Sequence, residues 1–163
     1  MYPILAASLC LMAIIHSVIA EPTISANSTA ELTWSAPAGW EKQQAGMMVL
    51  ESYLQNTPAG ELKLSISAFP GDVGGDLANV NRWLRQTGME AVTKETLPTV
   101  LKQELISGRE WKIVALANGE DGMFVAYTLS GSKSWFFKIT GPTAGIDSVH
   151  ASFKEFLATV GTK

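Results

Sequence analysis

Alternating apolar and polar residues predict most of the strands in this chain. The clearest case is the stretch 61–69, where Leu62, Leu64 and Ile66 alternate with lysine and serine. A period of two with one polar face is typical of an antiparallel strand that is covered on one side. Shorter stretches of the same kind predict further strands at 32–34, 47–54, 101–107, 110–117, 123–129 and 134–140.

A helical period predicts two helices. The first runs over 76–87, with Asp76 as its N-cap and Gly88 as its stop. The second lies between 143 and 160 and has a wider apolar stripe, which suits docking on a sheet. Runs of strands separated by single helices indicate an α+β fold: an antiparallel sheet of about six or seven strands with two packed helices. The apolar residues of the first helix share one narrow face: Leu77, Val80 and Leu84.

The N-terminal stretch predicts export. The first twenty residues hold no Lys, Arg, Asp or Glu and form one apolar run, which predicts a signal peptide over 1–20, cleaved after Ala20. An uncleaved membrane anchor is the alternative, because the run approaches the roughly 18–20 residues that span a bilayer. The polar residues 21–31 predict a flexible lead-in to a single domain over 32–163.

Cysteine, histidine and charge narrow the chemistry. Cys10 is the single cysteine and would leave with the signal peptide, so the mature chain would have no disulfide and no thiolate site. His150 would be the single histidine of the mature chain, which argues against His-rich metal sites and a Ser-His-Asp triad. The net charge of −3 argues against a nucleic-acid binder. We expect no cofactor and no metal.

The most specific stretch is 69–88, in which a glycine-rich loop at 70–75 (the glycine loop) leads into the first helix. Glycine allows positive φ and lets backbone N–H groups approach a partner. Helical geometry places Asn79, Arg82 and Gln86 toward the outer side, with Trp83 at the flank, and exposed Trp beside Arg is enriched at interface hot spots. We therefore predict a partner-binding surface formed by Asp72, Gly74, Gly75, Asn79, Arg82, Trp83 and Gln86.

Asn81 has a different predicted role, because the helical period places it beside the apolar stripe. A buried amide without partners costs ~1–3 kcal/mol. We therefore expect the Asn81 side chain to hydrogen-bond the backbone of the glycine loop or of a strand end, as a structural staple together with Asp76. The alternative for the whole motif is architectural: Asn79, Asn81 and Arg82 would only staple the loop to the sheet.

Residues 69–83 read Phe-Pro-Gly-Asp-x-Gly-Gly-x-x-x-Asn-x-Asn-Arg-Trp. This motif resembles the signature of a set of exported bacterial proteins of unknown function, and Trp34, Pro37, Gly39 and Trp40 fit the start of that pattern. The order of elements is also similar to the Mog1/PsbP-like sandwich, in which helices flank an antiparallel sheet. This second resemblance implies a binding or assembly factor without catalytic chemistry, although fold alone does not transfer function.

We therefore expect a periplasmic or secreted, non-catalytic binding or assembly module. Its partner would be an unknown protein of the cell envelope, with membrane contact only through an uncleaved N-terminal segment. Three alternatives use the same loop: a small anion held by the Gly74 and Gly75 amides with Arg82, calcium held by Asp72 and Asp76, and a hydrolase with these two carboxylates as an acid/base pair. Against the anion, the two carboxylates would repel it, and the glycine spacing matches neither the Walker A motif nor the dinucleotide-binding fingerprint. Against calcium, the alternating ligand pattern of an EF-hand loop is missing.

Overall fold

The structure is a computed structural model that describes residues 31–163. The predicted signal peptide, its cleavage site and most of the predicted lead-in lie outside the described residues. Within residues 31–163, no helix is long and apolar enough to cross a bilayer. The elements follow in chain order: β1 (Leu32–Thr33), β2 (Glu41–Gln43), β3 (Glu51–Thr57), β4 (Gly60–Pro70), α1 (Gly75–Gln86), α2 (Leu97–Val100), β5 (Leu101–Ile106), β6 (Arg109–Asn118), β7 (Asp121–Ser130), β8 (Lys133–Pro142), α3 (Thr143–Ala158) and β9 (Gly161–Thr162).

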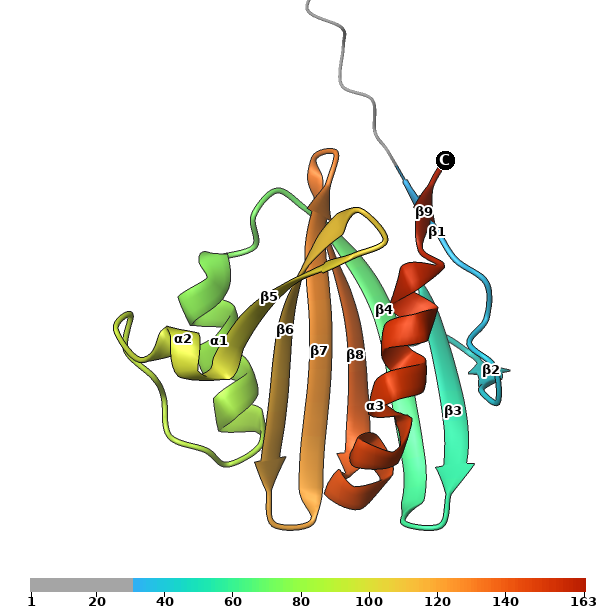
Figure 1. The fold of residues 1–163 in the computed structure, drawn as a ribbon, viewed down its shortest axis with the longest axis horizontal. Coiled ribbons are helices and arrows are strands. Elements are labelled where there is room, and N and C mark those ends of the chain that lie inside the picture. Colours follow the sequence, from blue (N-terminus) through green and yellow to red (C-terminus); the bar gives the residue numbers. More distant parts are fainter. Residues whose placement is uncertain (1–30) are drawn as a thin grey trace, which may run out of the picture.

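Seven strands form one sheet in the order β2-β3-β4-β8-β7-β6-β5 (Figure 1). Every neighbouring pair in it is antiparallel. The short strands β1 and β9 form a separate antiparallel pair. The predicted α+β fold, an antiparallel sheet of six to seven strands with two sizeable helices, is confirmed.

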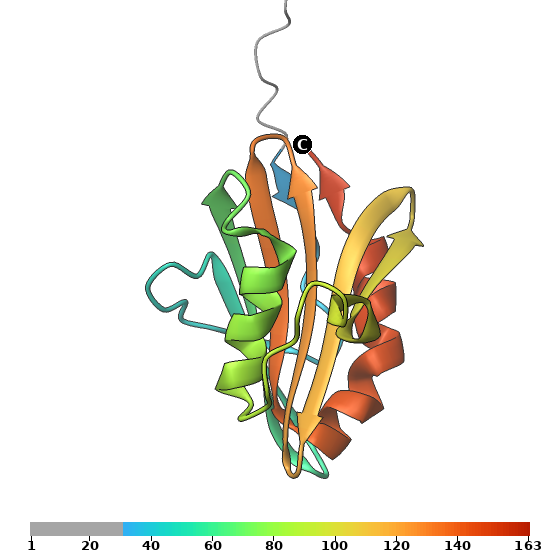
Figure 2. The ribbon, with the colours of Figure 1, turned by 90° about the vertical axis from the view of Figure 1, so that its left-hand side faces the viewer.

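The two long helices cover opposite faces of the sheet (Figures 1 and 2). Phe153 and Phe156 of α3 pack against one face, where Trp111, Phe124 and Phe137 from three central strands are buried. The period of two in each strand then sends the alternate side chains to the face of α1. These form the second core cluster: Val114, Leu116, Met123, Val125, Tyr127 and Phe136 under Val80, Trp83 and Leu84 of α1.

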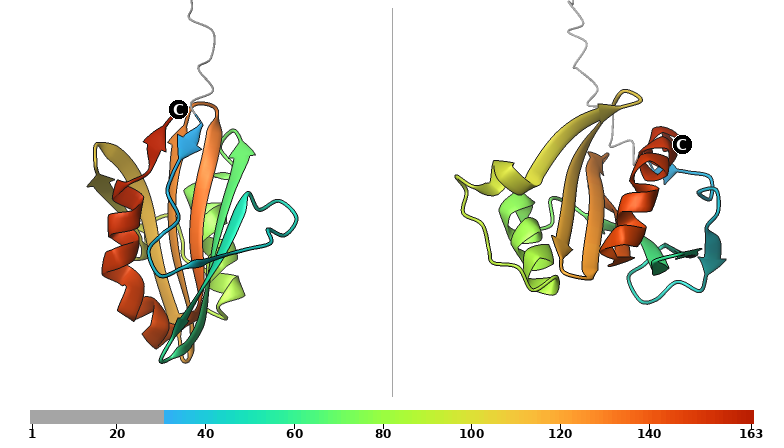
Figure 3. Two further views of the ribbon diagram at one scale, coloured as in Figure 1. Left: turned by 90° about the vertical axis from the view of Figure 1, so that its right-hand side faces the viewer. Right: turned by 60° about the horizontal axis from the view of Figure 1, so that its bottom comes forward.

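The predicted strand at 47–54 has the wrong boundaries. β3 begins at Glu51, and residues 44–50 form a loop between β2 and β3, here called the methionine loop. Met48 has a φ of 64°, a left-handed conformation that a strand does not contain. The loop lies on the same side of the sheet as α1 (Figures 2 and 3).

The elements α2, β2 and β9 have no predicted counterpart, because four, three and two residues are too few to show a period.

The Glu51 carboxylate fastens the N-terminal segment to the sheet. It accepts hydrogen bonds from Trp34 Nε1 at 2.7 Å, from the Tyr53 hydroxyl and from the Lys42 ammonium. Burial works to raise the pKa of Glu51, but hydrogen bonds from Lys42, Tyr53 and Trp34 outweigh it and hold that pKa below its ordinary value. Burial, with the hydrogen bond to Glu51, raises the pKa of Tyr53 to about 12.

Candidate functional site

The glycine loop takes the backbone conformation that its sequence predicts. Gly71, Gly74 and Gly75 have φ values of 71°, 83° and 74°, which only glycine adopts readily. The Gly71 amide donates to the Ser132 carbonyl at 2.7 Å, and Ser134 Oγ donates to the Gly71 carbonyl at 2.6 Å. The loop is therefore fastened to the β7–β8 hairpin.

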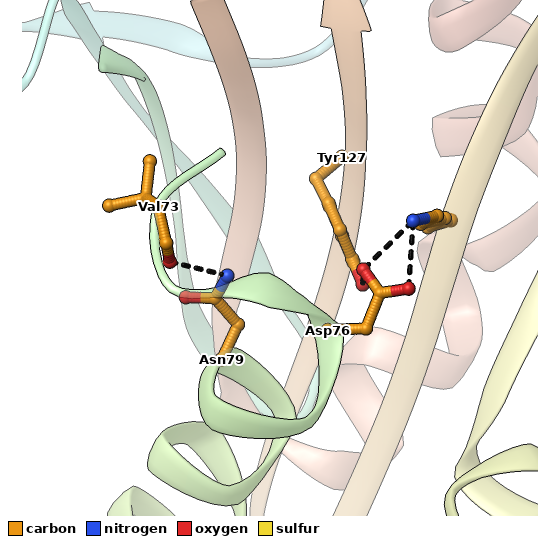
Figure 4. A network of polar contacts seen from close by, with 5 residues as sticks. Val73, Asp76, Asn79 and Tyr127 are labelled. Atoms are coloured by element: carbon orange, nitrogen blue, oxygen red, sulfur yellow. Dashed lines mark hydrogen bonds and ion pairs between the residues drawn. The ribbon is translucent and has the colours of Figure 1, made fainter. Parts of the chain in front are cut away.

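Asp76 does not cap α1, so that prediction is wrong. The helix begins at Gly75 with Gly74 as its N-cap and without a side-chain cap. The Asp76 carboxylate instead accepts hydrogen bonds from Lys112 Nζ at 2.7 and 2.9 Å and from the Tyr127 hydroxyl at 2.8 Å (Figure 4). These charge-assisted bonds to Lys112 tie the start of α1 to β6 and leave the carboxylate away from the helix amides. Burial, followed by the hydrogen bond to Asp76, raises the pKa of Tyr127.

Asn79, and not Asn81, holds the glycine loop. The predicted outward position of Asn79 is wrong: the side chain is 2% exposed, and its Nδ2 donates to the Val73 carbonyl at 2.9 Å (Figure 4). Its Oδ1 accepts from Arg82 Nη2 at 2.8 Å. The Asn81 amide instead contacts Val92, donating to its carbonyl at 2.9 Å and accepting from its N–H at 2.8 Å. Asn81 thus fastens the connection after α1, and its predicted contact with the loop is wrong.

Trp83 is 3% exposed, so the prediction of an outward indole is also wrong. Its ring packs edge-to-face on Tyr127 and Phe136, with centroid distances of 5.5 and 6.1 Å. Leu77, predicted to face the sheet, is only partly buried. Because an indole has more apolar area to bury than a leucine, the helix is turned so that Asn79 and Trp83 face the sheet.

Five of the predicted site residues line two different hollows, and Gly74, Gly75 and Asn79 line neither of them. Asp72 and Asp76 line a cavity of about 310 Å³ near the β7–β8 hairpin. Arg82, Trp83 and Gln86 line a different pocket of about 390 Å³, here called the α1 pocket. Within residues 31–163, no group of three His, Cys, Asp or Glu side chains is arranged to hold a metal ion. The structure therefore does not bring the loop carboxylates and the arginine into one site.

The α1 pocket lies between α1, the methionine loop and strands β4, β7 and β8. Phe69, Trp83 and Phe136 give it an apolar wall. Its charged groups are Arg82 and Lys138, and the described residues that line it include no Asp or Glu. The pocket is therefore apolar and positively charged.

Lys138 lies on β8 at the centre of the sheet, between Ser65 of β4 and Val125 of β7. Among the described residues, no hydrogen bond or ion pair reaches its ammonium group. Burial lowers the pKa of Lys138, and the nearby charges of Arg82 and Lys63 lower it further. Lys138 was not among the predicted site residues. The signal that could have found it is a lone charge inside the apolar stretch 135–139.

Comparison with known proteins identifies the fold but not a family. No protein-family model and no curated protein matches the chain, and the resemblance based on residues 69–83 stays a prediction. A protein from Bacteroides thetaiotaomicron is similar with a TM-score of 0.49 and 16% identity; the match covers 81% of this chain and 45% of that one.

Two further solved structures match over most of both chains. Cyanobacterial PsbP from Synechocystis sp. PCC 6803 has a TM-score of 0.51 and 10% identity, over 89% of this chain and 99% of that one. LpqN of Mycobacterium tuberculosis, described as involved in cell envelope biogenesis, has a TM-score of 0.51 and 10% identity, over 86% and 87%. With its antiparallel sheet between two helices, the chain has a PsbP/Mog1-like α+β fold.

Proposed function

We propose that this protein is an exported, non-catalytic binding module that takes an anionic ligand in the α1 pocket. The observation that carries the proposal is the pair of cations, Arg82 and Lys138, in an apolar pocket without an acidic residue among its described lining. Lys138 is partly buried without a partner among the described residues, and a ligand that brings a negative charge would offset the cost of burying its charge. The chain as a whole has a net charge of −3, so this positive charge is a local feature.

The pocket is partly organised before a ligand arrives. The Arg82 guanidinium donates to Asn79 Oδ1 and lies 6.0 Å from the centroid of the Trp83 ring. A side chain that is already positioned loses less conformational entropy on binding. The volume of about 390 Å³ lies within the range of roughly 300–1,000 Å³ that is typical of ligand pockets.

Export is supported by the apolar N-terminal run and by the likeness in fold to LpqN. N-terminal sequencing of the protein from an envelope or culture fraction tests this part of the proposal. A chain that begins at Glu21 would agree with cleavage after Ala20, and one that keeps Met1 would indicate an anchor. Binding to an envelope protein stays a prediction. Of the α1 side chains in the predicted partner-binding surface, Arg82 and Gln86 are exposed.

Titration with the fluorescent anion anilinonaphthalene sulfonate tests the binding site. We expect one saturable site whose affinity falls by about tenfold or more in Lys138→Met, because a charged hydrogen bond contributes ~1.5–3 kcal/mol. Arg82→Gln is expected to weaken binding as well. Arg85→Gln, on the same helix outside the pocket, and Lys102→Met, on β5, are the controls that remove the same charge. Equal affinity in all four variants, with circular dichroism showing folded protein, would refute the proposal.

A further inference from the structure

We propose that the ligand of the α1 pocket is a single-chain anionic amphiphile of the fatty-acid type. Its head group would lie at Arg82 and Lys138, and its hydrocarbon chain would lie under the methionine loop. This inference rests on the proposed function and names the class of ligand for the same pocket. Its basis is that the pocket has a charged end and an apolar end.

The register of the sheet separates the two ends. Lys138 pairs with Ser65, and Phe136 pairs with Ser67. Phe69 follows on β4 and lines the same pocket. From Ser65 to Phe69 the strand rises by about 13 Å, at roughly 3.3 Å per residue. The Lys138 ammonium therefore lies at one end of the pocket wall formed by β4 and β8, and the rings of Phe136 and Phe69 follow along that wall.

Arg82 reaches the Lys138 end of the pocket from α1. The glycine loop joins the end of β4 to Gly75, so α1 runs back along the sheet from the Phe69 end (Figure 1). From Gly75 to Arg82 the helix rises by about 10 Å, at roughly 1.5 Å per residue. This places Arg82 near Lys138, in agreement with the effect of the guanidinium charge on that lysine. Val73, just before the helix, stays at the apolar end and lines the pocket there.

Residues 47–49 of the methionine loop line the pocket together with the aromatic rings. The Leu50 amide donates to the Ile66 carbonyl at 2.8 Å, and β3 begins with Glu51 opposite Ile66. The methionine loop therefore joins the sheet beside Ile66, between Ser65 and Ser67, which both line the pocket. Met47 and Met48 line the pocket, yet they are 92% and 69% exposed. Methionine adapts its shape to apolar surfaces, and a hydrocarbon chain would remove this exposed area from water.

Calorimetric titration of the intact chain with decanoate, below the concentration at which decanoate aggregates, tests the inference. Decanoate is expected to bind at one site. Acetate keeps the charge without the chain and should bind more than about a hundredfold more weakly. Decanol keeps the chain without the charge and should bind at least about tenfold more weakly. Failure of decanoate to bind, or equal affinity for acetate, would overturn the inference.

The methionine loop is tested by Met48→Asn, because asparagine tolerates the left-handed backbone at this position. Decanoate affinity is expected to fall by about threefold or more. Leu105→Asn removes another apolar side chain, 76% exposed on β5 outside the pocket, and should leave the affinity unchanged. Unchanged affinity in Met48→Asn would overturn the placement of the chain under the loop.

Three further outcomes separate this inference from the proposed function and from a membrane surface. If anilinonaphthalene sulfonate binds in a way that depends on Lys138 but decanoate does not bind, the amphiphile is wrong and the anion pocket stands. If neither probe binds, both proposals fail. Sedimentation with vesicles of anionic phospholipid is expected to leave the protein in the supernatant. If the wild-type protein sediments with the vesicles and Met48→Asn does not, the methionine loop binds a membrane surface, and the proposal of a free amphiphile as ligand is overturned.

Discussion

The amide of Asn81 gives the sharpest test of how the motif after β4 works. Its side chain makes two hydrogen bonds to one backbone residue, Val92, at 2.8 and 2.9 Å. These bonds tie the connection after α1 back to the middle of that helix. Asn81→Ala removes both bonds and leaves the helix in place.

The expected loss of stability follows from these contacts. Two neutral hydrogen bonds contribute about 0.5–1.5 kcal/mol each, or about 1–3 kcal/mol together. Alanine is a better helix former than asparagine by up to ~0.7 kcal/mol, which offsets part of the loss. Val92 is only partly buried, so its freed backbone groups reach water and the full desolvation cost does not apply. We expect the free energy of unfolding to fall by about 1–2 kcal/mol.

Urea unfolding, followed by circular dichroism, measures this change. Asn81→Asp keeps an oxygen that accepts from the Val92 amide but loses the donor, so its stability should lie between wild type and Asn81→Ala. Arg85→Ala, an exposed change on the same helix, should stay within about 0.5 kcal/mol of wild type. If Asn81→Ala is as stable as Arg85→Ala, the two bonds to Val92 do not stabilise the fold and the reasoning is refuted.

Three further predictions concern the core, a glycine and an acidic group. Trp83→Ala should lower the free energy of unfolding by about 3–5 kcal/mol in the same urea experiment, and a small loss would contradict a buried indole. Gly141 has a φ of 150°, and an added Cβ would lie 2.6 Å from the Glu61 carbonyl oxygen. Gly141→Ala should therefore lower the melting temperature more than Gly108→Ala, whose Cβ meets nothing within 4 Å; similar shifts would argue against the close approach. Because the pKa of Glu51 is lowered in the folded state, its ionised carboxylate stabilises the fold at pH values above its ordinary pKa of 4.5. This stabilisation is lost as the pH falls through the pKa of the folded state. Wild type should thus exceed Glu51→Gln in stability at neutral pH and converge with it in acid, and a gap that persists in acid would contradict this.

Most strands of the sheet could be predicted because their periods are long and end at clear turns; β2 is too short, and the start of β3 was misplaced. β4 shows regular alternation, and the β7–β8 hairpin is marked by Gly131 at its tip. The strand predicted at 32–34 corresponds to β1, but its pairing with β9 could not be predicted, because two residues on each strand carry no period. Their pairing depends on where α3 ends, which is a property of the packed fold.

The site was harder to predict, because helix rotation and sheet order are set by packing. The apolar stripe of α1 was narrow, and the burial of Trp83 rather than Leu77 turned Asn79 inward. Lys138 and Arg82 line the same pocket because β4, which leads into α1, is the neighbour of β8 in the sheet. The sequence shows each cation, but the strand order that brings them together comes from the structure.

The pairing of β1 with β9 has a mechanical consequence. Leu32 lies opposite Thr162, and the Lys163 amide donates to the Glu31 carbonyl at 2.9 Å, so both ends of the described chain leave the fold side by side (Figure 1). Tension applied between Glu31 and Lys163 would load these bonds one after another, as a zip opens, and not all at once in shear. The β1–β9 pair would therefore separate at a low force, before the seven-stranded sheet bears any of it.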